Sequence, residues 1–553
     1  MPSPLVIKSP LLKPLGALAL VQKGGAAYYR ELKSSPDRYI AAGAWCTMLE
    51  SKLMTYSLEA EVMAYCGYAA VRARAFAYFE AVYEHGLARQ AAETPAKSAA
   101  DFEQAAMLAE LAQDDTAGAE AAGELYLATG DLTHLRIASE KAELAGGWRP
   151  SLEWALRAVA IAPLNPAPVQ RLFMVLASSA QPDLIEEAAE ILRGRNLHLQ
   201  VAQIFLAASA MLRQDARLCL TRLKPLDDSK IIANPILKPY LGAVRSLRAE
   251  AEEKLGEYRK AYDAYAALNA AERDSNIDPA DFYKGVAIRG KLVVPELPPT
   301  DDRAVQMLGF PRSGTTLLET VLAAHPAIET FEETSALVVA IDRIERVLLA
   351  KWPLEAPEET FRAARARYYE ELAALRRKPE ASVLVDKMPI RTADTSLISR
   401  LFPEWRYVFS IRHPFDVVLS CFKQRFTPNP AMENFRTIED SVRLYDFAMT
   451  EWFKHHTMDD PTVHYVRYDE LVTDFERVTA GTLSFLGVPW NDNVRDFAKA
   501  AESRAVKTPS YQKVRQGLTI GVQTAWRNYD FLFQAPVAKP LHKWAEFFGY
   551  PTK

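Results

Sequence analysis

One short stretch in the second half of the chain, Val305–Leu318, constrains the fold more than any other. An apolar run is followed by a turn that contains Gly309 and Gly314, and then by a segment with the composition of a helix. A buried strand, a Gly-rich turn and a helix in that order form a loop whose backbone N–H groups can hold an oxyanion at the helix N-terminus. The stretch therefore predicts an anion-binding loop.

The residues inside this loop differ from those of an ATP-binding loop. The two glycines bracket four residues, as in a Walker A loop, but Thr315 and Thr316 follow where that loop has Lys and then Ser or Thr. The lysine that contacts the β- and γ-phosphates of ATP is missing, and Arg312 lies within the loop instead. Backbone N–H groups, two hydroxyls and one guanidinium can bind an oxyanion, but they suit ATP with Mg²⁺ poorly.

The second half of the chain alternates between short β-rich runs and helical patterns. The β-rich runs are Ala304–Gly309, Ser382–Val385, Arg406–Ile411 and Thr462–Val466. This alternation predicts a parallel sheet with covering helices. In such open sheets ligands bind beyond the carboxyl ends of the strands, which is where the polar motifs of this half fall.

The first half has a different pattern, with helical periodicity and many Ala, Leu and Glu residues from about residue 30 to 285. Leu255–Ala261 (Leu-Gly-Glu-Tyr-Arg-Lys-Ala) resembles the Leu-Gly-x-x-Tyr-x-x-Ala core of a tetratricopeptide unit, and Ala155–Pro166 and Leu125–Leu132 resemble other parts of such units. A generic helical bundle is the alternative. We favour a solenoid of degenerate repeats, which would leave a concave surface for an acceptor or a partner protein.

The Pro-rich, acidic segment Leu292–Asp302 has the composition of a semi-rigid linker. We therefore expect an all-α tetratricopeptide-like solenoid followed by an α/β domain of P-loop type with a parallel sheet. The predicted domain bounds are residues 1–290 for the helical repeats, 291–302 for the linker and 303–553 for the α/β domain.

A second motif, Tyr407–Ser420, supplies further anion-binding groups. Arg412 ends a predicted strand, and Pro414 and Asp416 fit the first turn of a helix. Ser420 lies one turn beyond Asp416 on the same helix face, so Arg412 and Ser420 can converge on one phosphate. Arg412 alone would be read as a surface ion-pair partner, but the first loop favours a binding role.

Both motifs together resemble those of sulfotransferases that use 3′-phosphoadenosine-5′-phosphosulfate (PAPS). Residues from about 303 to 550 are similar to this domain, in particular to bacterial tetratricopeptide-repeat sulfotransferases and tyrosylprotein sulfotransferases. The resemblance implies that the first loop holds the 5′-side of PAPS through Arg312, Ser313, Gly314, Thr315 and Thr316. It also implies that Arg412 and Ser420 bind the 3′-phosphate.

The resemblance also implies which residues carry the chemistry. In the family a glutamate eight residues after a His-Pro pair acts as general base, and Glu333 holds that position after His325-Pro326. Glu332 is the alternative. Lys387, two residues beyond the second β-rich run, would contact the transferred sulfuryl group or the bridging oxygen. Ser510 matches a serine of the late cofactor-covering loop, and we assign it to the catalytic group.

Other positions complete or depart from the family pattern. Tyr468 matches a tyrosine that lies near the nucleotide, and Arg515, with Lys513, adds positive charge to the late loop. Relatives usually have Gly where Phe331 stands, and often Pro at Gly517. They often have a basic residue at the position of Ala525. In this chain Arg527 would supply that positive charge, from a different direction.

The composition of the chain argues against some classes of partner and location. The chain has 553 residues, 49% hydrophobic and 25% charged, with a net charge of -4. These values are typical of globular protein and argue against a nucleic-acid partner. The apolar stretch Pro14–Val21 is too short to span a bilayer, and a signal peptide is the less favoured interpretation because no convincing cleavage site follows. We expect a cytoplasmic protein without a membrane span.

Three functions remain open. The favoured one is transfer of a sulfuryl group from PAPS, which leaves 3′,5′-ADP (PAP) as product, to a hydroxyl of a protein tyrosine, a glycan or another large acceptor. A P-loop nucleotide kinase or NTPase would need the missing lysine and an Asp for Mg²⁺. A repeat scaffold with an inactive nucleotide-binding domain is the third. No cluster has the spacing of metal ligands, so we expect no metal.

Overall fold

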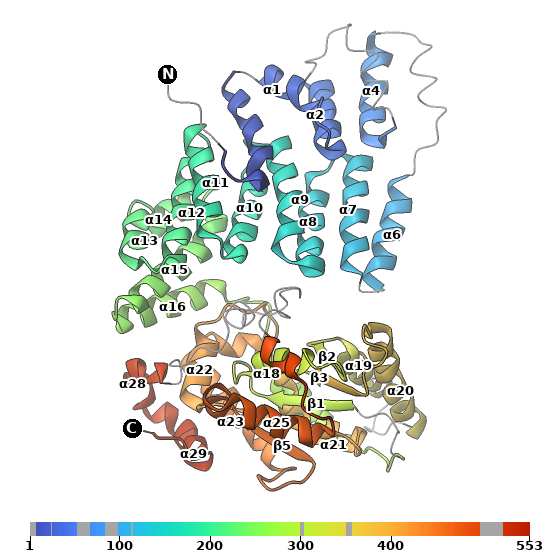
Figure 1. Cartoon of the computed structure of the whole chain (residues 1–553), viewed down its shortest axis with the longest axis vertical. Coiled ribbons are helices and arrows are strands. Elements are labelled where there is room, and N and C mark those ends of the chain that lie inside the picture. Colours follow the sequence, from blue (N-terminus) through green and yellow to red (C-terminus); the bar gives the residue numbers. More distant parts are fainter. Residues whose placement is uncertain are drawn as a thin grey trace. The chain divides into compact units, whose positions relative to one another are not determined.

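The computed structural model describes residues 7–23, 25–51, 67–82, 98–111, 114–298, 304–349, 357–497 and 524–552. The chain divides into two compact units, Met1–Ala264 and Tyr265–Lys553. Figure 1 shows that the first contains helices and that the second contains the sheet. This confirms the predicted order of an all-α region followed by an α/β region.

The first unit is a series of helices in which each helix packs against the next along much of the series. They are α1 (Gly25–Leu32), α2 (Arg38–Glu50), α4 (Ala69–Val82), α6 (Ala99–Leu111), α7 (Asp115–Thr129), α8 (Leu132–Gly146), α9 (Trp148–Ile161), α10 (Pro166–Ser179), α11 (Pro182–Gly194), α12 (Leu199–Leu212), α13 (Ala216–Leu223), α14 (Asp228–Ala233) and α15 (Leu241–Lys254), with 3₁₀ turns η1 (Pro10–Lys23) and η3 (Lys238–Tyr240). The next helix, α16 (Tyr258–Glu272), contains the boundary between the two units.

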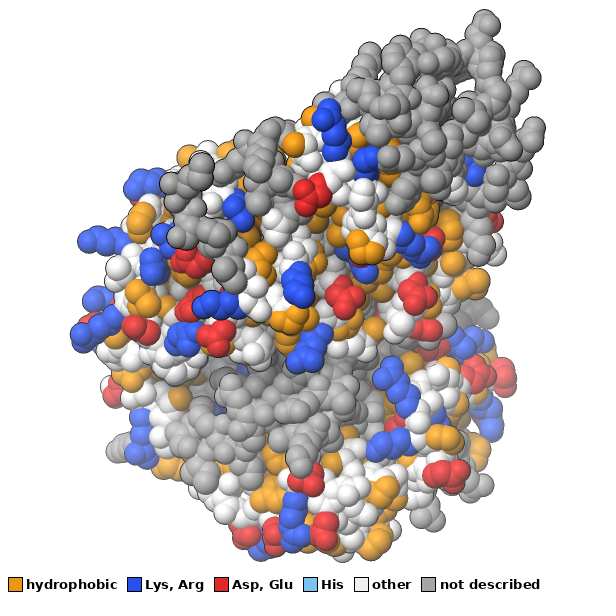
Figure 2. All heavy atoms as spheres, turned by 45° about the horizontal axis from the view of Figure 1, so that its top comes forward, with side chains coloured by type: hydrophobic (Ala, Val, Ile, Leu, Met, Phe, Trp, Pro, Cys, Tyr) orange, Lys and Arg blue, Asp and Glu red, His pale blue; other side chains and the backbone are white. Residues whose placement is uncertain are grey.

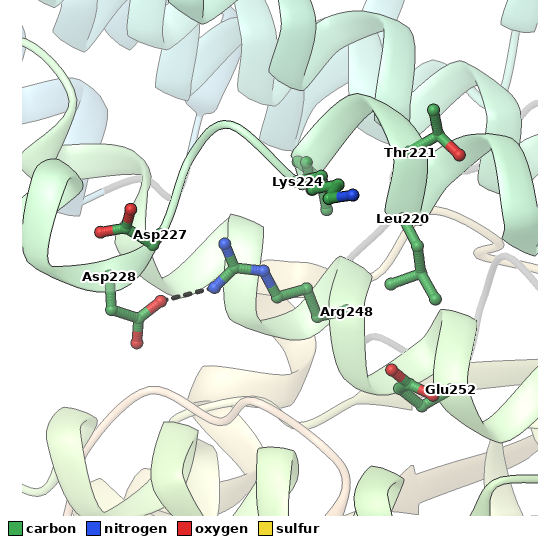
Figure 3. Close-up of a pocket in the computed structure, with 8 residues that line it drawn as sticks. Leu220, Thr221, Lys224, Asp227, Asp228, Arg248 and Glu252 are labelled. Atoms are coloured by element: carbon green, nitrogen blue, oxygen red, sulfur yellow. Dashed lines mark hydrogen bonds and ion pairs between the residues drawn. The ribbon is translucent and has the colours of Figure 1, made fainter.

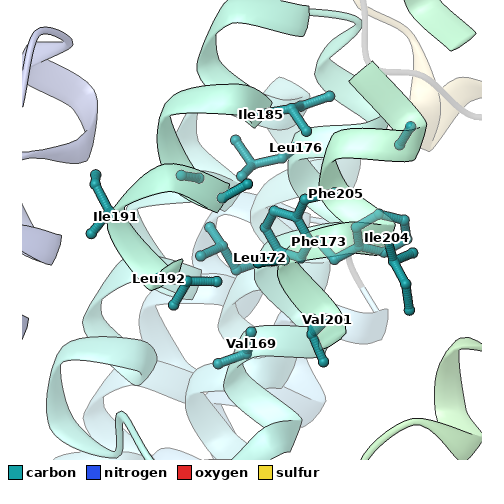
Figure 4. Packing of buried hydrophobic residues seen from close by; sticks show 14 of the residues in the cluster. Val169, Leu172, Phe173, Leu176, Ile185, Ile191, Leu192, Val201, Ile204 and Phe205 are labelled. Atoms are coloured by element: carbon teal, nitrogen blue, oxygen red, sulfur yellow. The ribbon is translucent and has the colours of Figure 1, made fainter. Parts of the chain in front are cut away.

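Close helix packing in this unit depends on small residues and on a continuous apolar core. A Cβ added to Gly123 on α7 would lie 2.4 Å from the Trp154 ring on α9. Figure 4 shows side chains of α10, α11 and α12, among them Phe173 and Phe205, interdigitating in one cluster. The apolar stretch near the N-terminus belongs to this core, because Leu12, Leu15 and Leu18 of η1 are fully buried.

The turns predicted from the repeat-like segments join helices as expected. Thr129 ends α7 and Asp131 caps α8, where its carboxylate accepts from the backbone N–H of Thr133. Asn165 caps α10 directly before Pro166. These boundaries follow from local capping chemistry. The assignment of the helices to tetratricopeptide repeats stays a prediction.

The second unit contains a five-stranded parallel sheet in the order β2-β3-β1-β4-β5. The strands are β1 (Ala304–Gly309), β2 (Ile328–Glu332), β3 (Val383–Lys387), β4 (Arg406–Ile411) and β5 (Val463–Arg467). Four of the five lie at the predicted β-rich runs. The fifth, β2, was not predicted. Its two glutamates are unusual in a buried strand, but Glu329 accepts from the backbone of Arg377 and Lys378 and pairs with Arg376.

Helices accompany this sheet. They are α17 (Ala280–Gly290), α18 (Thr315–Ala323), α19 (Ala336–Leu349), α20 (Glu358–Leu375), α21 (Thr395–Leu401), α22 (Pro414–Phe422), α23 (Ile438–Phe453), α24 (Tyr468–Thr473), α25 (Phe475–Leu486), α28 (Asp530–Phe533) and α29 (Lys539–Phe547), with 3₁₀ turns η4 (Pro389–Asp394), η5 (Met432–Phe435), η6 (Asp492–Asp496), η7 (Ala525–Tyr529) and η8 (Pro536–Ala538).

The compact units divide earlier than the predicted domain boundary, because residues before the Pro-rich segment pack on the sheet domain. Arg289 of α17 forms an ion pair with the buried Asp394 at 2.6 Å. The Asn269 side chain donates to the backbone oxygen of Phe422 at 2.8 Å. The linker role of residues 291–302 stays a prediction, and residues 299–302 lie outside the described residues.

The exposed surface mixes both signs of charge. On the face in Figure 2, lysine and arginine side chains alternate with aspartate and glutamate over the described residues. Within the described part of the chain, no helix combines the length and the apolar composition needed to cross a membrane.

Candidate functional site

The loop between β1 and α18 has the geometry of an anion cradle. Gly314 adopts φ 98° at the start of α18, and a Cβ there would lie 2.4 Å from Cδ2 of Tyr468, so only glycine fits. Among the described residues, no side chain caps this helix. The first N–H groups of α18, with the buried hydroxyl-bearing Thr315 and Thr316, can therefore bind an oxyanion.

Two further features of the loop favour a ligand. Arg312 adopts φ 71°, a left-handed conformation that costs energy in a non-glycine residue and is often found at binding sites. The Ser313 hydroxyl is buried with no hydrogen-bond partner among the described residues. A phosphate or sulfate oxygen would satisfy a hydroxyl in this position.

Arg312 and Arg412, with Ser420 and Tyr468, form what we call the guanidinium cluster. Arg312 Nε donates to Ser420 Oγ at 3.1 Å, and Arg412 Nη1 donates to the backbone oxygen of Arg312 at 3.2 Å. The Arg412 guanidinium lies 4.8 Å from the centre of the Tyr468 ring. The structure thus brings together residues from the β1–α18 loop, the end of β4, α22 and the residue after β5.

Two positive charges at close range favour a bound anion. Burial lowers the pKa of Arg312, and the positive charge of Arg412 acts in the same direction. Asp416 is the acidic residue on the neighbouring turn of α22, but its Oδ1 accepts the backbone N–H of Trp526 at 3.0 Å, and burial raises its pKa. A phosphate group would compensate the charge of both arginines.

Lys387, Glu332 and Glu333 form a second group, the carboxylate cluster, at the ends of β2 and β3. Lys387 Nζ donates to Glu332 Oε1 at 3.1 Å and to Glu333 Oε1 at 2.9 Å. The side chains of Lys387, Glu332 and Glu333 are 0%, 10% and 42% exposed. Both glutamates therefore reach the same ammonium group, and Glu333 is the one that faces solvent.

The environment of this cluster controls its protons. Burial lowers the pKa of Lys387, but the negative charges of Glu332, Glu333 and Glu319 outweigh it and leave the pKa raised. Burial raises the pKa of Glu332, although Lys387 opposes this. Glu333 adopts φ 48°, and its backbone N–H donates to the oxygen of Lys387 at 2.9 Å. A strained backbone at this position fits a functional role.

Part of the predicted site lies outside the described residues. Ser510, Arg515 and Lys513 belong to residues 498–523, so their roles stay predictions. Both clusters lie at the carboxyl ends of parallel strands, as the sequence predicts for a ligand site. Within the described part of the chain, no group of three or more His, Cys, Asp or Glu residues is arranged to hold a metal ion.

Two buried acids near the site were not predicted from the sequence. Glu319 lies one turn beyond Thr315 on the same face of α18, and this spacing from the loop could have identified it. Asp386 precedes Lys387 and accepts from the Tyr368 hydroxyl at 3.1 Å, while Gln306 Nε2 donates to that hydroxyl at 2.7 Å. Neighbouring strand residues point to opposite faces, so Asp386 and Lys387 face different layers.

A separate hollow lies in the helical unit, between α13, α14 and α15 (Figure 3). It is lined by Leu220, Thr221, Leu223, Lys224, Asp227, Asp228, Arg248 and Glu252. Arg248 pairs with Asp228 at 2.5 Å, and Arg245 pairs with the same carboxylate at 2.7 Å. This hollow shares no residue with the two clusters.

Comparison with protein families decides the identity of the sheet domain. The model of the sulfotransferase family matches residues 305–492. Residues 305–492 form a sulfotransferase-family domain. The matched segment contains β1 to β5 and both clusters.

Two relatives match part of the chain at low identity. A protein of Aquifex aeolicus is 26% identical over 312 residues, which are 53% of this chain and 40% of that protein. Protein-tyrosine sulfotransferase 1 of Danio rerio is 26% identical over 192 residues, which are 34% of this chain and 53% of that protein. The chain thus spans about half or less of the length of these relatives.

Solved sulfotransferase structures also match, at low similarity. The sulfotransferase domain of a Synechococcus olefin synthase is 21% identical, with a TM-score of 0.35. The match covers 47% of this chain and 99% of that domain.

Proposed function

We propose that the protein transfers a sulfuryl group from PAPS to a hydroxyl of a large acceptor. The observation that carries this proposal is the Lys387–Glu333 pair, a buried ammonium and a partly exposed carboxylate 2.9 Å apart in a sulfotransferase-family domain. The pair lies at the same sheet edge as an anion cradle that lacks the lysine of ATP-binding loops. An acid, a base and an anion site at one edge suit group transfer between two oxygens.

The donor side would be held by the cradle and the guanidinium cluster. The first N–H groups of α18, Ser313, Thr315 and Thr316 would bind the 5′-phosphosulfate, and Arg412 with Ser420 would bind the 3′-phosphate. These donors and positive charges are fixed in place before the reaction. They can therefore stabilise the negative charge that builds on the leaving phosphate without rearrangement. The Ser313 hydroxyl, buried without a hydrogen-bond partner among the described residues, fits such a group.

The acceptor side would be served by the carboxylate cluster. The acceptor hydroxyl loses its proton to Glu333, and its oxygen attacks the sulfur in line with the departing phosphate oxygen. Lys387 neutralises charge on the transferred group or on the bridging oxygen. These roles need one ionised carboxylate and one ammonium ion, which is the arrangement that the ion pair provides.

The acceptor class rests on the relatives and on the helical unit. The related proteins are named protein-tyrosine sulfotransferases, which favours a tyrosine hydroxyl of a peptide or protein. A glycan hydroxyl is the other possibility. We propose that the helical unit presents the acceptor or a partner protein, since a stack of helices offers an extended surface.

A test combines nucleotide selection with product identification. PAP should raise the thermal midpoint of the full chain more than ATP with Mg²⁺ does, because ligands stabilise the state that binds them. Incubation with PAPS carrying labelled sulfate should then label macromolecules in a lysate of the native organism, and mass spectrometry should place the label on a hydroxyl. Stabilisation by ATP alone, without labelling, would contradict the proposal.

A further inference from the structure

The short segment that follows α29, residues 548–551, contacts the turn after β4. His413 Nε2 donates to the backbone oxygen of Pro551 at 2.8 Å. Because a carbonyl oxygen can only accept, Nε2 carries the proton, and Nδ1 of the neutral ring accepts the backbone N–H of Phe415 at 3.3 Å. Burial lowers the pKa of His413 to about 4, and the charge of Arg412 acts in the same direction. The neutral His413 ring is therefore held by hydrogen bonds at both nitrogens.

The same segment contacts the residues on both sides of Tyr468, at the end of β5. Arg467 Nη1 donates to the backbone oxygen of Phe548 at 2.6 Å, and the Arg467 guanidinium lies 4.2 Å from the centre of the Tyr550 ring. The Tyr550 hydroxyl donates to Asp469 Oδ1. Tyr468 thus lies between two residues that one short segment holds.

Tyr550 connects the ends of the two strands, which are parallel neighbours in the sheet. Its ring centre lies 5.1 Å from that of His413, and its hydroxyl reaches Asp469. Arg412 directly precedes His413, and Tyr468 directly precedes Asp469. The Arg412 guanidinium lies over the Tyr468 ring. The segment therefore holds the immediate neighbours of two members of the guanidinium cluster.

We propose that Tyr550 and His413 are positioning residues that orient Arg412 and Tyr468 toward one phosphate group of the ligand. Holding the His413 ring fixes the peptide that joins it to Arg412, and holding Asp469 fixes the ring on which the guanidinium lies. A guanidinium that binds phosphate through two donors needs this fixed geometry, because its planar donors must match the positions of the oxygens. The assignment of this group to the 3′-phosphate of PAPS rests on the proposed function, whereas the hold on the strand ends does not.

The nucleotide selectivity of the full chain tests this role by calorimetry. In Tyr550→Ala the affinity for PAP should fall by about tenfold, while the affinity for 5′-AMP, which lacks the 3′-phosphate, should change by less than about twofold. Tyr550→Phe loses only the hydroxyl contact with Asp469, and its affinity for PAP should fall by about threefold. Phe547→Ala is the matched control and should leave both affinities unchanged. Phe547 is an aromatic residue of the same region, but it is 50% exposed and packs on Phe453 of α23.

Hydrogen exchange without nucleotide separates this inference from the proposed function. Peptides that contain residues 410–416 and 466–471 should exchange faster in Tyr550→Ala than in the wild type or in Phe547→Ala, because the strand ends open more often once the segment releases them. Unchanged exchange in these peptides, or equal weakening of PAP and 5′-AMP in both Tyr550 variants, would overturn the inference. A wild type that binds PAP no more tightly than 5′-AMP would contradict the proposed function instead, and faster exchange in Tyr550→Ala would still support the hold on the strand ends.

Discussion

The guanidinium cluster and the carboxylate cluster lie at the same edge of one sheet but use charge in opposite ways. In the first, Arg312 and Arg412 contact a hydroxyl, a backbone oxygen and an aromatic ring. In the second, Lys387 contacts two carboxylates directly. The first arrangement places two guanidinium groups beside the anion cradle, whereas the second pairs an ammonium group with carboxylates that can exchange a proton.

This difference matches the different chemical needs of the donor and of the acceptor in the proposed reaction. A nucleotide with several phosphate oxygens brings its own negative charge, so its site needs excess positive charge and rigid donors. An acceptor hydroxyl is neutral and must lose a proton, so its site needs a carboxylate that stays ionised beside a cation. Variants that change one cluster should therefore leave the function of the other intact.

The largest effect is expected at the carboxylate cluster. Glu333→Gln keeps the size of the side chain but cannot accept a proton, so kcat should fall by ~10²–10⁴ in a PAPS turnover assay. The Kd for PAP, measured by calorimetry, should stay nearly constant because this carboxylate does not hold the nucleotide.

Glu332→Gln is the matched control for that variant. Glu332 is largely buried whereas Glu333 is 42% exposed, so the loss of kcat in Glu332→Gln should be much smaller. If the two variants exchange these effects, Glu332 is the base. If neither slows turnover, the base lies elsewhere.

The guanidinium cluster should show the opposite separation of effects. Arg412→Ala removes charged hydrogen bonds to the 3′-phosphate, each contributing about 1.5–3 kcal/mol, so PAP should bind roughly 10²-fold more weakly. The affinity for 5′-AMP, which lacks that phosphate, should change little. Arg406→Ala, at the other end of β4, is the control and should preserve the preference for PAP. Equal weakening of both nucleotides would remove Arg412 from 3′-phosphate recognition.

The next prediction concerns the stability of the protein and uses a buried aspartate of the sheet domain, Asp386. Burial raises the pKa of Asp386 to about 6. The folded state therefore holds this proton more tightly than the unfolded state does. The resulting stabilisation of the fold is fully present below the ordinary pKa of an aspartate and is lost as pH rises through about 6. Asp386→Asn should therefore stabilise the protein by about 2 kcal/mol near pH 8, but very little near pH 4.

The reason for this gain is local, and a paired aspartate provides its control. Gln306 Oε1 is buried without a hydrogen-bond partner among the described residues, so the new amide has an acceptor nearby. Asp394 is also buried, but it pairs with Arg289 and Arg391 at 2.6 and 2.7 Å. Asp394→Asn should destabilise the protein at both pH values. Thermal midpoints across pH measure both variants, and a gain for Asp386→Asn that does not vary with pH would contradict the assignment.

The smallest expected effect concerns the loop itself. Gly314→Ala forces a left-handed backbone on a residue with a side chain and brings its Cβ against Tyr468, so PAP affinity should fall by about tenfold. Gly487→Ala is the control, since Gly487 has φ 76° but nothing within 4 Å of an added Cβ. It should lower stability through backbone strain and leave PAP binding unchanged. Similar losses of affinity in both variants would mean that Tyr468 does not limit the loop.

Patterns of local chemistry predicted much of this fold. β1 and β4 have the predicted bounds because their apolar runs are flanked by clear turn and helix signals. β2 escaped prediction because Glu329 and Glu332 interrupt the apolar pattern, and their burial is possible only through partners more than 45 residues away in sequence. The boundary between the two compact units could not be predicted from the sequence either, because it depends on contacts such as that of Arg289 with Asp394.

For the site, the sequence by itself determined the anion loop, Arg412 with Ser420, and the pair of adjacent acids, because each depends on residue types at short spacing. The tertiary structure decided which groups share a charge environment. Glu332 and Glu333 are equivalent neighbours in sequence. They become unequal because Glu332 pairs with Lys387 within the sheet and is largely buried, whereas Glu333 lies beyond the strand and is 42% exposed. Electrostatic interactions depend on distance and burial, and only the folded chain fixes these for residues far apart in sequence.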